Sequence, residues 1–317
     1  MLRGVGLRAL ELVAVLLLVS FGVFMLVSLV SGDPAVAVLG SGHTKAEYAA
    51  LHHQMGLDRA LLPRYLDWLG GVLHGDFGTS LLPPQTSVLS RLAAAMPVSV
   101  ELAVLGLVLA LLFAVPLAMW AAHHEGGRID RAISAVMFGL LSMPSFLVGL
   151  LLIGVFVSGL GWFPRNEWVR LSDSVGGNLQ HAFLPAVTIA LMEMAMYTRI
   201  LRNDLVTTLK EDYILAARAR GMSPWHILVT DALRPSSFSL VTILGLSLGR
   251  LIGSTVIVEY LFALPGVGRL VIDAATQGNY PMVQGAVLLI ALIYVLTNVG
   301  IDLSYGYLDP RTRRARA

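Results

Sequence analysis

Six long apolar runs restrict what this chain of 317 residues can fold into. The expected membrane spans are residues 12–30, 102–122, 132–160, 182–197, 238–257 and 283–301. A helix needs about 20 mostly apolar residues to cross the hydrocarbon core of a bilayer. Because backbone polar groups in lipid must be satisfied internally, the runs predict an all-α integral membrane protein with six transmembrane helices. The composition agrees, since 56% of the residues are hydrophobic and only 13% are charged.

Three polar or helix-breaking residues lie inside these spans. Pro144 interrupts the third span and predicts a kink there. Glu193 makes the fourth span the shortest and its limits the least well defined, and Arg250 lies in the fifth. Charge inside a membrane is costly, so Glu193 and Arg250 are expected either to form an internal pair or to face a polar path.

The charges of the connecting segments predict the orientation of the chain. If the segments alternate in side, one side holds 14 Lys and Arg and the other 7, with Arg250 in a span. The side richer in Lys and Arg is expected to be cytoplasmic, which places both termini and the loop at 201–235 there. Because the net charge is only +2 and the basic residues lie in loops, we take them to indicate the orientation of the chain in the lipid bilayer and predict no nucleic-acid binding.

The segment between the first two spans contains two helix signals. Thr44 and Glu47 have the spacing of a capping box and predict a short helix. Leucines recur at helical spacing at positions 62, 66, 69 and 73, so a second, amphipathic helix is expected.

The loop at 201–235 contains the residues that typically end one helix and begin another at a sharp turn. Residues 204–220 contain good helix formers and are expected to be helical. Gly221 follows where a helix prefers a left-handed residue, Ser223 is a favoured N-cap, and Pro224 suits the first position of a new helix. The loop is either a solvated surface hairpin or a docking element.

The same loop carries a resemblance to a known family. Ala216, Ala217 and Gly221, followed by Leu233 and Pro235, resemble the signature loop of binding-protein-dependent ABC importer permeases. Leu215 replaces the Glu that usually leads this signature, as is common in the peptide-importing branch, and Arg234 intervenes before the proline. The resemblance extends to the segment at 75–80, to the Pro265-Gly266 link and to the basic tail after residues 308–310.

This resemblance implies the architecture and partners of a type I ABC importer permease in a bacterial cytoplasmic membrane. Residues 1–96 would form the first helix and an extracytoplasmic segment, 97–306 the permease core, and 307–317 a cytoplasmic tail. The implied partners are a second homologous permease, two ABC ATPase subunits and an extracytoplasmic substrate-binding protein. The implied cargo is a dipeptide or oligopeptide, with nickel chelates or glutathione as alternatives.

ATP and Mg are expected on the ATPase subunits, and no cofactor is expected on this chain. The only lysines are Lys45 and Lys210, and neither follows a glycine, so the phosphate-binding loop of an ATPase is absent. The chain has no cysteine, and its paired histidines at 52–53 and 123–124 lack metal-ligand spacing, so no metal site is predicted.

Three groups of candidate site residues follow. The resemblance implies an ATPase-coupling loop made by Ala216, Ala217, Gly221, Ser223, Pro224, Trp225 and His226. It also implies an extracytoplasmic link that faces the binding protein or re-enters the cavity, although a plain turn would have the same pattern: Pro265, Gly266, Gly268, Tyr280 and Pro281. Gly245, Gly249 and Gly253, four residues apart, predict a flat helix face for close packing beside the translocation path.

Two other functional classes stay open. A secondary transporter would need coupling-ion sites in broken helices. An intramembrane serine protease would use Ser247, between Gly245 and Gly249, with a base such as His181, but no second motif supports it and we predict no catalytic residue.

Overall fold

The computed structural model describes residues 2–29, 34–40, 42–54, 57–164 and 167–308. These residues form helices and connecting segments, and they contain no strand beyond one isolated bridge between Thr79 and Ser87. The expected all-α fold is therefore confirmed. Residues 309–317, most of the expected basic tail, lie outside the described residues.

The described helices account for the expected spans. Four of them are long and apolar enough to cross a membrane, and a fifth span is obtained if one bent pair of helices counts as one crossing. A shorter apolar stretch, Leu12–Ser28, lies in the first helix, so each of the six expected runs coincides with a helix or with the bent pair.

The chain divides into two compact units. Unit 1 comprises Met1–Ser99 and Pro265–Ala317, and unit 2 comprises Val100–Leu264. Helix α5 (Val88–His123) contributes its first residues to unit 1 and the rest to unit 2.

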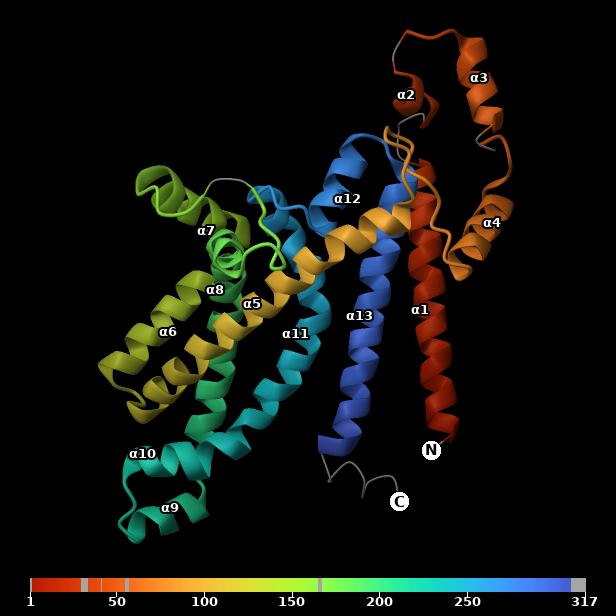
Figure 1. Ribbon diagram of the computed structural model, residues 1–317. Helices are drawn as coiled ribbons and strands as arrows, with labels where there is room; N and C mark the ends of the chain where they lie inside the picture. Colours follow the sequence, from red (N-terminus) through yellow and green to blue (C-terminus); the bar gives the residue numbers. More distant parts are fainter. Residues whose placement is uncertain (1, 30–33, 41, 55–56, 165–166, 309–317) are drawn as a thin grey trace. The chain divides into compact units, whose positions relative to one another are not determined.

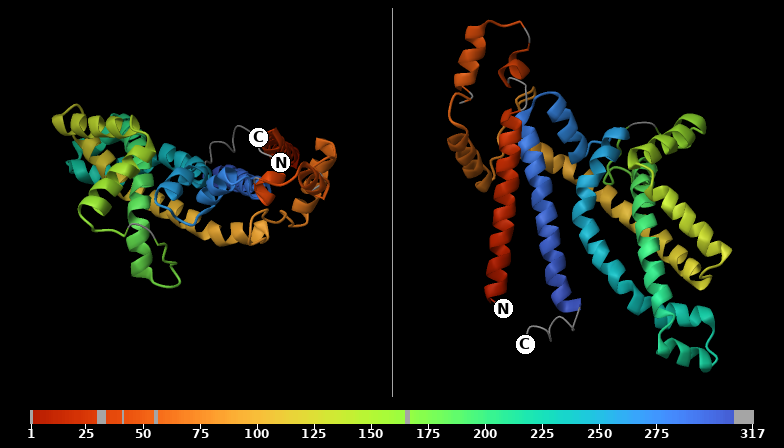
Figure 2. Two further views of the ribbon diagram at one scale, coloured as in Figure 1. Left: turned by 90° about the horizontal axis from the view of Figure 1, so that it is seen from above. Right: turned by 180° about the vertical axis from the view of Figure 1, so that it is seen from behind.

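Unit 1 is built on a pair of long helices. α1 (Leu2–Leu29) and α13 (Tyr280–Leu308) pack side by side, as both Figure 1 and Figure 2 show. α12 (Val267–Thr276) packs on α13. The shorter helices of this unit are α2 (Pro34–Leu39), α3 (Lys45–Gln54) and α4 (Leu61–Leu73).

The two predicted short helices are confirmed as α3 and α4. Glu47 Oε2 accepts a hydrogen bond of 2.7 Å from the Thr44 N–H, and the Glu47 N–H donates to Thr44 Oγ1 at 3.3 Å, which is a capping box. The backbone hydrogen bond from Thr44 is the main reason why the pKa of Glu47 lies below its usual value. α4 contacts α1 through Tyr65, whose ring meets the ring of Phe21 edge to face at 5.1 Å, and its leucines at 62, 66 and 73 are exposed.

Unit 2 is organised around the long helix α8 (Val175–Thr208), which packs against α6, α7 and α11. The remaining elements are α6 (Arg128–Leu141), α7 (Ser145–Leu152), the π-helical segment η1 (Ile153–Gly159), α9 (Asp212–Ala219), α10 (Pro224–His226), the π-helical segment η2 (Ile227–Ala232) and α11 (Leu233–Leu261).

The close approach of α5 and α8 depends on a glycine. A Cβ at Gly106 would lie 2.7 Å from Ile189 Cγ2, so α5 and α8 meet there without room for a side chain.

The spans differ from expectation in two places. The interruption at Pro144 is larger than a kink, because α6 ends at Leu141 and α7 begins at Ser145 with a bend of 101° between them. The fourth span is much longer than 182–197, since α8 has 34 residues and accommodates Pro185. Its start is fixed by Ser174, whose Oγ accepts a hydrogen bond from the Gly177 N–H at 3.1 Å.

The expectation of one continuous helix over 204–220 is wrong. α8 ends at Thr208, Glu211 is extended, and α9 begins at Asp212. The break lets α9 turn back so that Ile214 and Ala217 become buried in the core of unit 2. Tertiary burial has therefore overridden a favourable helix propensity.

Candidate functional site

A glycine-centred turn joins α9 to α10, and we refer to residues 212–226 as the hairpin. Gly221 has φ +82°, its N–H donates to Arg218 O at 2.9 Å, and the Met222 N–H donates to Ala217 O at 3.4 Å. These two bonds form a Schellman motif, which satisfies the last carbonyls of α9. Glycine is the residue that adopts this left-handed backbone without strain, so the predicted turn at Gly221 is present in the structure.

The second helix starts immediately after the turn. Ser223 Oγ accepts a hydrogen bond from the His226 N–H at 3.3 Å, and Pro224 occupies the first helical position. α10 continues without interruption through η2 into α11, so the hairpin and the fifth expected span form one continuous helical path.

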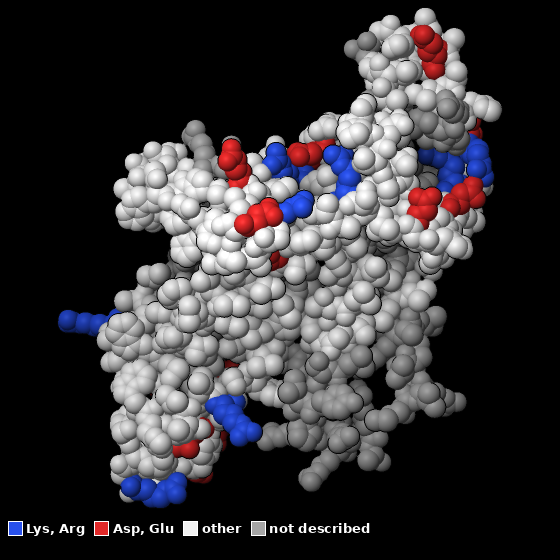
Figure 3. Space-filling view, viewed as in Figure 1, with Lys and Arg blue, Asp and Glu red and all other residues white. Residues whose placement is uncertain are grey.

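The hairpin has a buried face and an exposed face. Ile214 and Ala217 of α9 are buried in the same cluster as Ile227 and Leu228 of η2. The exposed face combines apolar and basic side chains: Tyr213, Leu215, Ala216, Arg218, Arg220 and Trp225. Figure 3 shows Lys and Arg at the end of unit 2 formed by α9 and α10, with Asp and Glu beside them. A mixed apolar and basic surface on a buried base is suited to docking another protein.

The two alanines of the signature therefore do different things. Ala217 is 2% exposed and fits a small space in the core, whereas Ala216 lies on the exposed face. The two alanines are adjacent in the sequence, and the structure shows that one packs in the core while the other lies on the surface.

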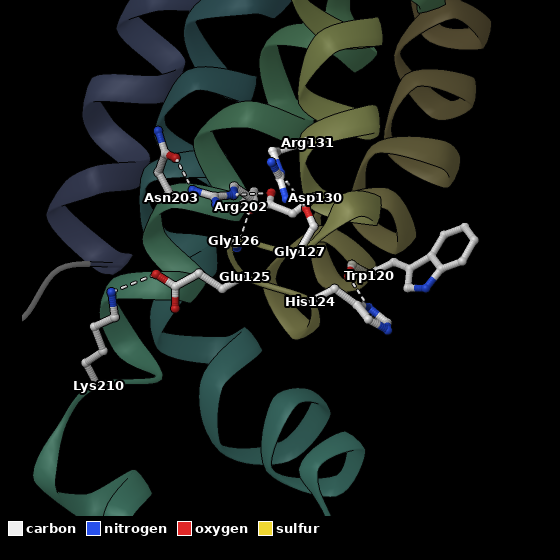
Figure 4. A network of polar contacts seen from close by, with 10 residues as sticks. All are labelled: Trp120, His124, Glu125, Gly126, Gly127, Asp130, Arg131, Arg202, Asn203 and Lys210. Carbon is white, nitrogen blue, oxygen red and sulfur yellow. Dashed lines mark hydrogen bonds and ion pairs between the residues drawn. The ribbon is translucent and has the colours of Figure 1, made fainter.

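Two contacts connect the hairpin and the residues just before it to the end of α5 and to the loop that follows α5. The Trp225 ring stacks on the His123 ring with centroids 4.8 Å apart. Lys210 Nζ lies 2.8 Å from Glu125 Oε1, as Figure 4 shows, and both side chains are largely exposed. An exposed ion pair stabilises little, so the ring stacking and the buried face carry most of this connection.

A buried ion pair that the sequence analysis missed lies next to this loop. Asp130, at the start of α6, is buried and accepts a hydrogen bond of 2.9 Å from Arg202 Nε of α8 (Figure 4). Its second oxygen accepts from the Gly126 N–H at 2.9 Å. The signal that could have identified it is a single acid between Arg128 and Arg131, in the segment that follows Gly126 and Gly127. The pair holds the α5–α6 loop against α8.

The two charged residues expected inside the spans meet in the structure. Arg250 Nη2 of α11 lies 2.8 Å from Glu193 Oε1 and 3.1 Å from Oε2 on α8. Ser247 Oγ also donates to Glu193 Oε2, at 3.3 Å. Glu193 is buried, but the Arg250 side chain is 53% exposed. The arrangement is an internal pair with one charged member that also reaches the surface of unit 2.

Ser247 does not have the setting of a hydrolase nucleophile. It lies inside the continuous helix α11, whereas a nucleophile elbow joins a strand to a helix. His181 Nδ1 lies 2.7 Å from Gly177 O in its own helix. The three glycines of α11 also have different surroundings, because Gly249 is buried, Gly245 is half-buried and Gly253 is exposed.

In unit 1 the predicted link lies against the segment that precedes α5. Asn279 Oδ1 accepts a hydrogen bond from the Leu81 N–H at 3.1 Å, and Asn279 Nδ2 donates to Ser80 Oγ at 2.8 Å. Ser99 Oγ accepts from the Val267 N–H at the start of α12. Of the link residues, Gly266 and Gly268 are buried, Tyr280 and Pro281 are half-buried, and Pro265 is exposed.

Comparison with known proteins identifies the family. Residues 114–314 match the family described as binding-protein-dependent transport system inner membrane component, and residues 1–103 match its N-terminal counterpart. The chain belongs to this family. It is thus a multi-pass membrane permease, the non-catalytic component of a binding-protein-dependent ABC transporter.

Relatives of this permease match it over almost their whole length. A probable peptide ABC transporter permease protein, y4tP, of Sinorhizobium fredii is 33% identical over 96% of this chain and 97% of its own. The oligopeptide transport system permease protein AppB of Bacillus subtilis is 32% identical over the same shares. The glutathione transport system permease protein GsiC of Salmonella choleraesuis is 33% identical over 99% of both chains.

Solved structures agree on the fold. A chain of the MetNI methionine ABC transporter in inward-facing conformations superposes with a TM-score of 0.55 at 18% identity, over 69% of this permease and 96% of that chain. An amino acid ABC transporter gives a TM-score of 0.51 at 15% identity. The permease therefore has the type I importer fold.

Proposed function

We propose that this permease forms part of the path by which di- or oligopeptides enter a bacterial cell in an ATP-driven importer. The names of relatives that match at 32–33% identity over nearly the full chain support peptides as the cargo. The equally similar glutathione permease supports glutathione as the nearest alternative, since glutathione is also a small, peptide-like anion. Nickel chelates remain a third candidate, and none of these relatives favours them.

The observation that carries the coupling part of the proposal is the two-faced hairpin. Its exposed face, with Leu215, Ala216 and Trp225, is the docking surface for an ATPase subunit. Its buried face and the continuous helix from α10 through η2 into α11 make it a stiff connection. When the ATPases close around ATP and Mg, they push the hairpin, and the spans of unit 2 move with it.

The Glu193–Arg250 pair is the candidate for the polar lining of the path. An arginine that is 53% exposed inside a membrane span is costly to place against lipid, so water, a partner subunit or cargo should meet it. Glu193 accepts two hydrogen bonds from Arg250 Nη2, and among the described residues all the side-chain hydrogen bonds of Arg250 come from that one nitrogen. The other guanidinium donors can meet the carboxylate of a passing peptide.

The complete importer would comprise this permease, a second homologous permease, two ABC ATPases and an extracytoplasmic binding protein. Both termini and the hairpin would face the cytoplasm, as the bias of Lys and Arg predicts. The link with Pro265 and Tyr280 would then lie on the outer side, where the binding protein docks or the link re-enters the cavity.

The test is reconstitution of the permease with the ATPases and binding protein encoded with it. We expect two ATPase subunits to copurify and a labelled tripeptide to enter liposomes only with ATP. Ala216→Asp should abolish copurification while leaving the permease folded, and Ser90→Asp, at an exposed position outside unit 2, should change nothing. Uptake without any ATPase would instead support a secondary transporter, and uptake of a nickel chelate but no peptide would overturn the assigned cargo.

A further inference from the structure

A cavity of about 280 Å³ lies between α5, α6 and α8, near the end of unit 2 that carries the hairpin. One part of its wall is polar and includes Thr198, Arg199, Arg202 and Asn203. Another part is apolar and includes Met137 and Phe138. A cavity with one polar and one apolar wall suits an amphiphile better than a small ion.

The polar wall contains one exposed amide beside the Arg202–Asp130 pair. Asn203 is exposed, and its Oδ1 accepts a hydrogen bond of 3.2 Å from Arg202 Nη1.

The cavity also carries one positive charge that the described residues do not balance. Arg202 is paired with Asp130, so its charge is neutralised. Arg199 lies over the Phe138 ring, with its guanidinium carbon 4.7 Å from the centroid, and no carboxylate of the described residues forms an ion pair with it. One unneutralised guanidinium favours a ligand with one negative charge, and guanidinium binds phosphate well.

The surroundings of the cavity point to the membrane. Val136 and Phe138 on α6 are exposed large apolar residues, as is Trp120 near the end of α5. Figure 4 shows the Trp120 ring directed away from the Arg202–Asp130 pair. Tryptophan is enriched at the depth of the lipid headgroups, so the cavity lies where a headgroup and the start of an acyl chain can enter.

We propose that this cavity binds the headgroup of an anionic phospholipid. Arg199 pairs with the phosphodiester, and the acyl chain lies along Met137 and Phe138. The bound lipid thereby joins α6 to α8 beside the ion pair that holds the α5–α6 loop. Basic pockets between membrane helices are a known setting for such headgroups.

The experiment measures binding of defined lipids to the full-length, delipidated permease in detergent by native mass spectrometry. Phosphatidylglycerol should bind and phosphatidylcholine should not. Arg199→Gln should weaken phosphatidylglycerol binding about tenfold or more, as expected for loss of a charged hydrogen bond. Arg199→Lys should restore part of the affinity, which distinguishes a binding role from misfolding.

The matched control is Arg131→Gln. Arg131 lies on the same helix as Phe138 but outside the cavity, and it bonds only the Gly127 carbonyl among the described residues. It should leave lipid binding unchanged. Equal binding of both lipids, or equal loss in the Arg131 and Arg199 variants, would overturn the proposal. If millimolar inorganic phosphate displaces bound phosphatidylglycerol as effectively as added phosphatidylglycerol does, the cavity binds free phosphate. That result would also overturn the proposal.

Discussion

Trp225 on α10 stacks on His123 at the end of α5, with ring centroids 4.8 Å apart and ring planes 25° apart. The contact joins the tip of the hairpin to a membrane span that is distant in sequence. Since α10 continues into α11, a displacement of the hairpin acts on α5 and α11 together. In the proposed coupling, the stacked pair would act as a mechanical connection as well as a packing contact.

The first prediction concerns this pair. His123→Ala removes the stacking but keeps every side chain of the exposed face of the hairpin, and an aromatic contact contributes about 0.5–1.5 kcal/mol. We expect ATPase binding to persist while peptide uptake per ATP hydrolysed falls several-fold in liposomes. His123→Phe keeps a ring at this position and should retain most of the coupling. Full coupling in the alanine variant would show that the stacking transmits no motion.

The second prediction concerns Gly221. Its φ of +82° is unfavourable for a residue with a Cβ, and a β-branched residue is the least tolerant. Gly221→Val should cost about 1–2 kcal/mol in this turn and reduce copurification of the ATPases. Gly221→Asn is the matched control, because asparagine tolerates the left-handed region. If the two variants behave alike, the surface at the turn matters more than its backbone.

The third prediction separates the two signature alanines. Ala217→Leu inserts a larger side chain into a packed core and should lower the free energy of unfolding by about 1–3 kcal/mol. Ala216→Leu keeps an apolar surface at an exposed position and should leave the thermal unfolding temperature nearly unchanged. The check is thermal unfolding of both variants in detergent. A larger loss in the Ala216 variant would contradict the assignment of the two faces.

How much of this arrangement the sequence could predict depends on the range of the interactions involved. The turn at Gly221 and the cap at Ser223 follow from local backbone preferences, so they were predictable. The apolar runs located the spans because lipid imposes their length and polarity. The Glu193–Arg250 pair was anticipated only as one of two alternatives, since nothing in the sequence fixes which side chains of two distant spans meet.

Other features arise from contacts that no local pattern encodes. The break after Thr208 depends on burial of Ile214 against other helices, and local propensity favoured a longer helix. The Leu periodicity of α4 predicted its helix correctly, but Tyr65 makes the contact with α1. The bend between α6 and α7 reaches 101° where a proline alone predicted only a kink.

The fourth prediction tests the charged pair inside the spans. Glu193→Leu leaves Arg250 without its counter-ion and should reduce the yield of folded permease, with a cost of up to about 3 kcal/mol. Because Arg250 is half exposed, water screens part of this cost. The double variant Glu193→Leu with Arg250→Met removes both charges and should recover the folding yield but not peptide uptake. Recovery of uptake as well would show that the pair has a structural role alone.

The last prediction concerns Asn279 in unit 1. Its amide donates to Ser80 Oγ, whose own hydroxyl proton is directed to Leu82 O at 3.1 Å, while its carbonyl accepts from the Leu81 N–H. Asn279→Asp replaces the donor by a second acceptor in a buried position, so two lone pairs face each other. We expect a loss of about 1–3 kcal/mol in the free energy of unfolding. Combining Asn279→Asp with Ser80→Ala removes the conflicting oxygen and should recover part of that loss, which thermal unfolding of the wild type and the two variants would measure. If Asn279→Asp leaves the free energy of unfolding unchanged, the Ser80 hydroxyl must reorient to donate to the carboxylate. The amide at this position would then make no contribution to stability beyond that of an acid.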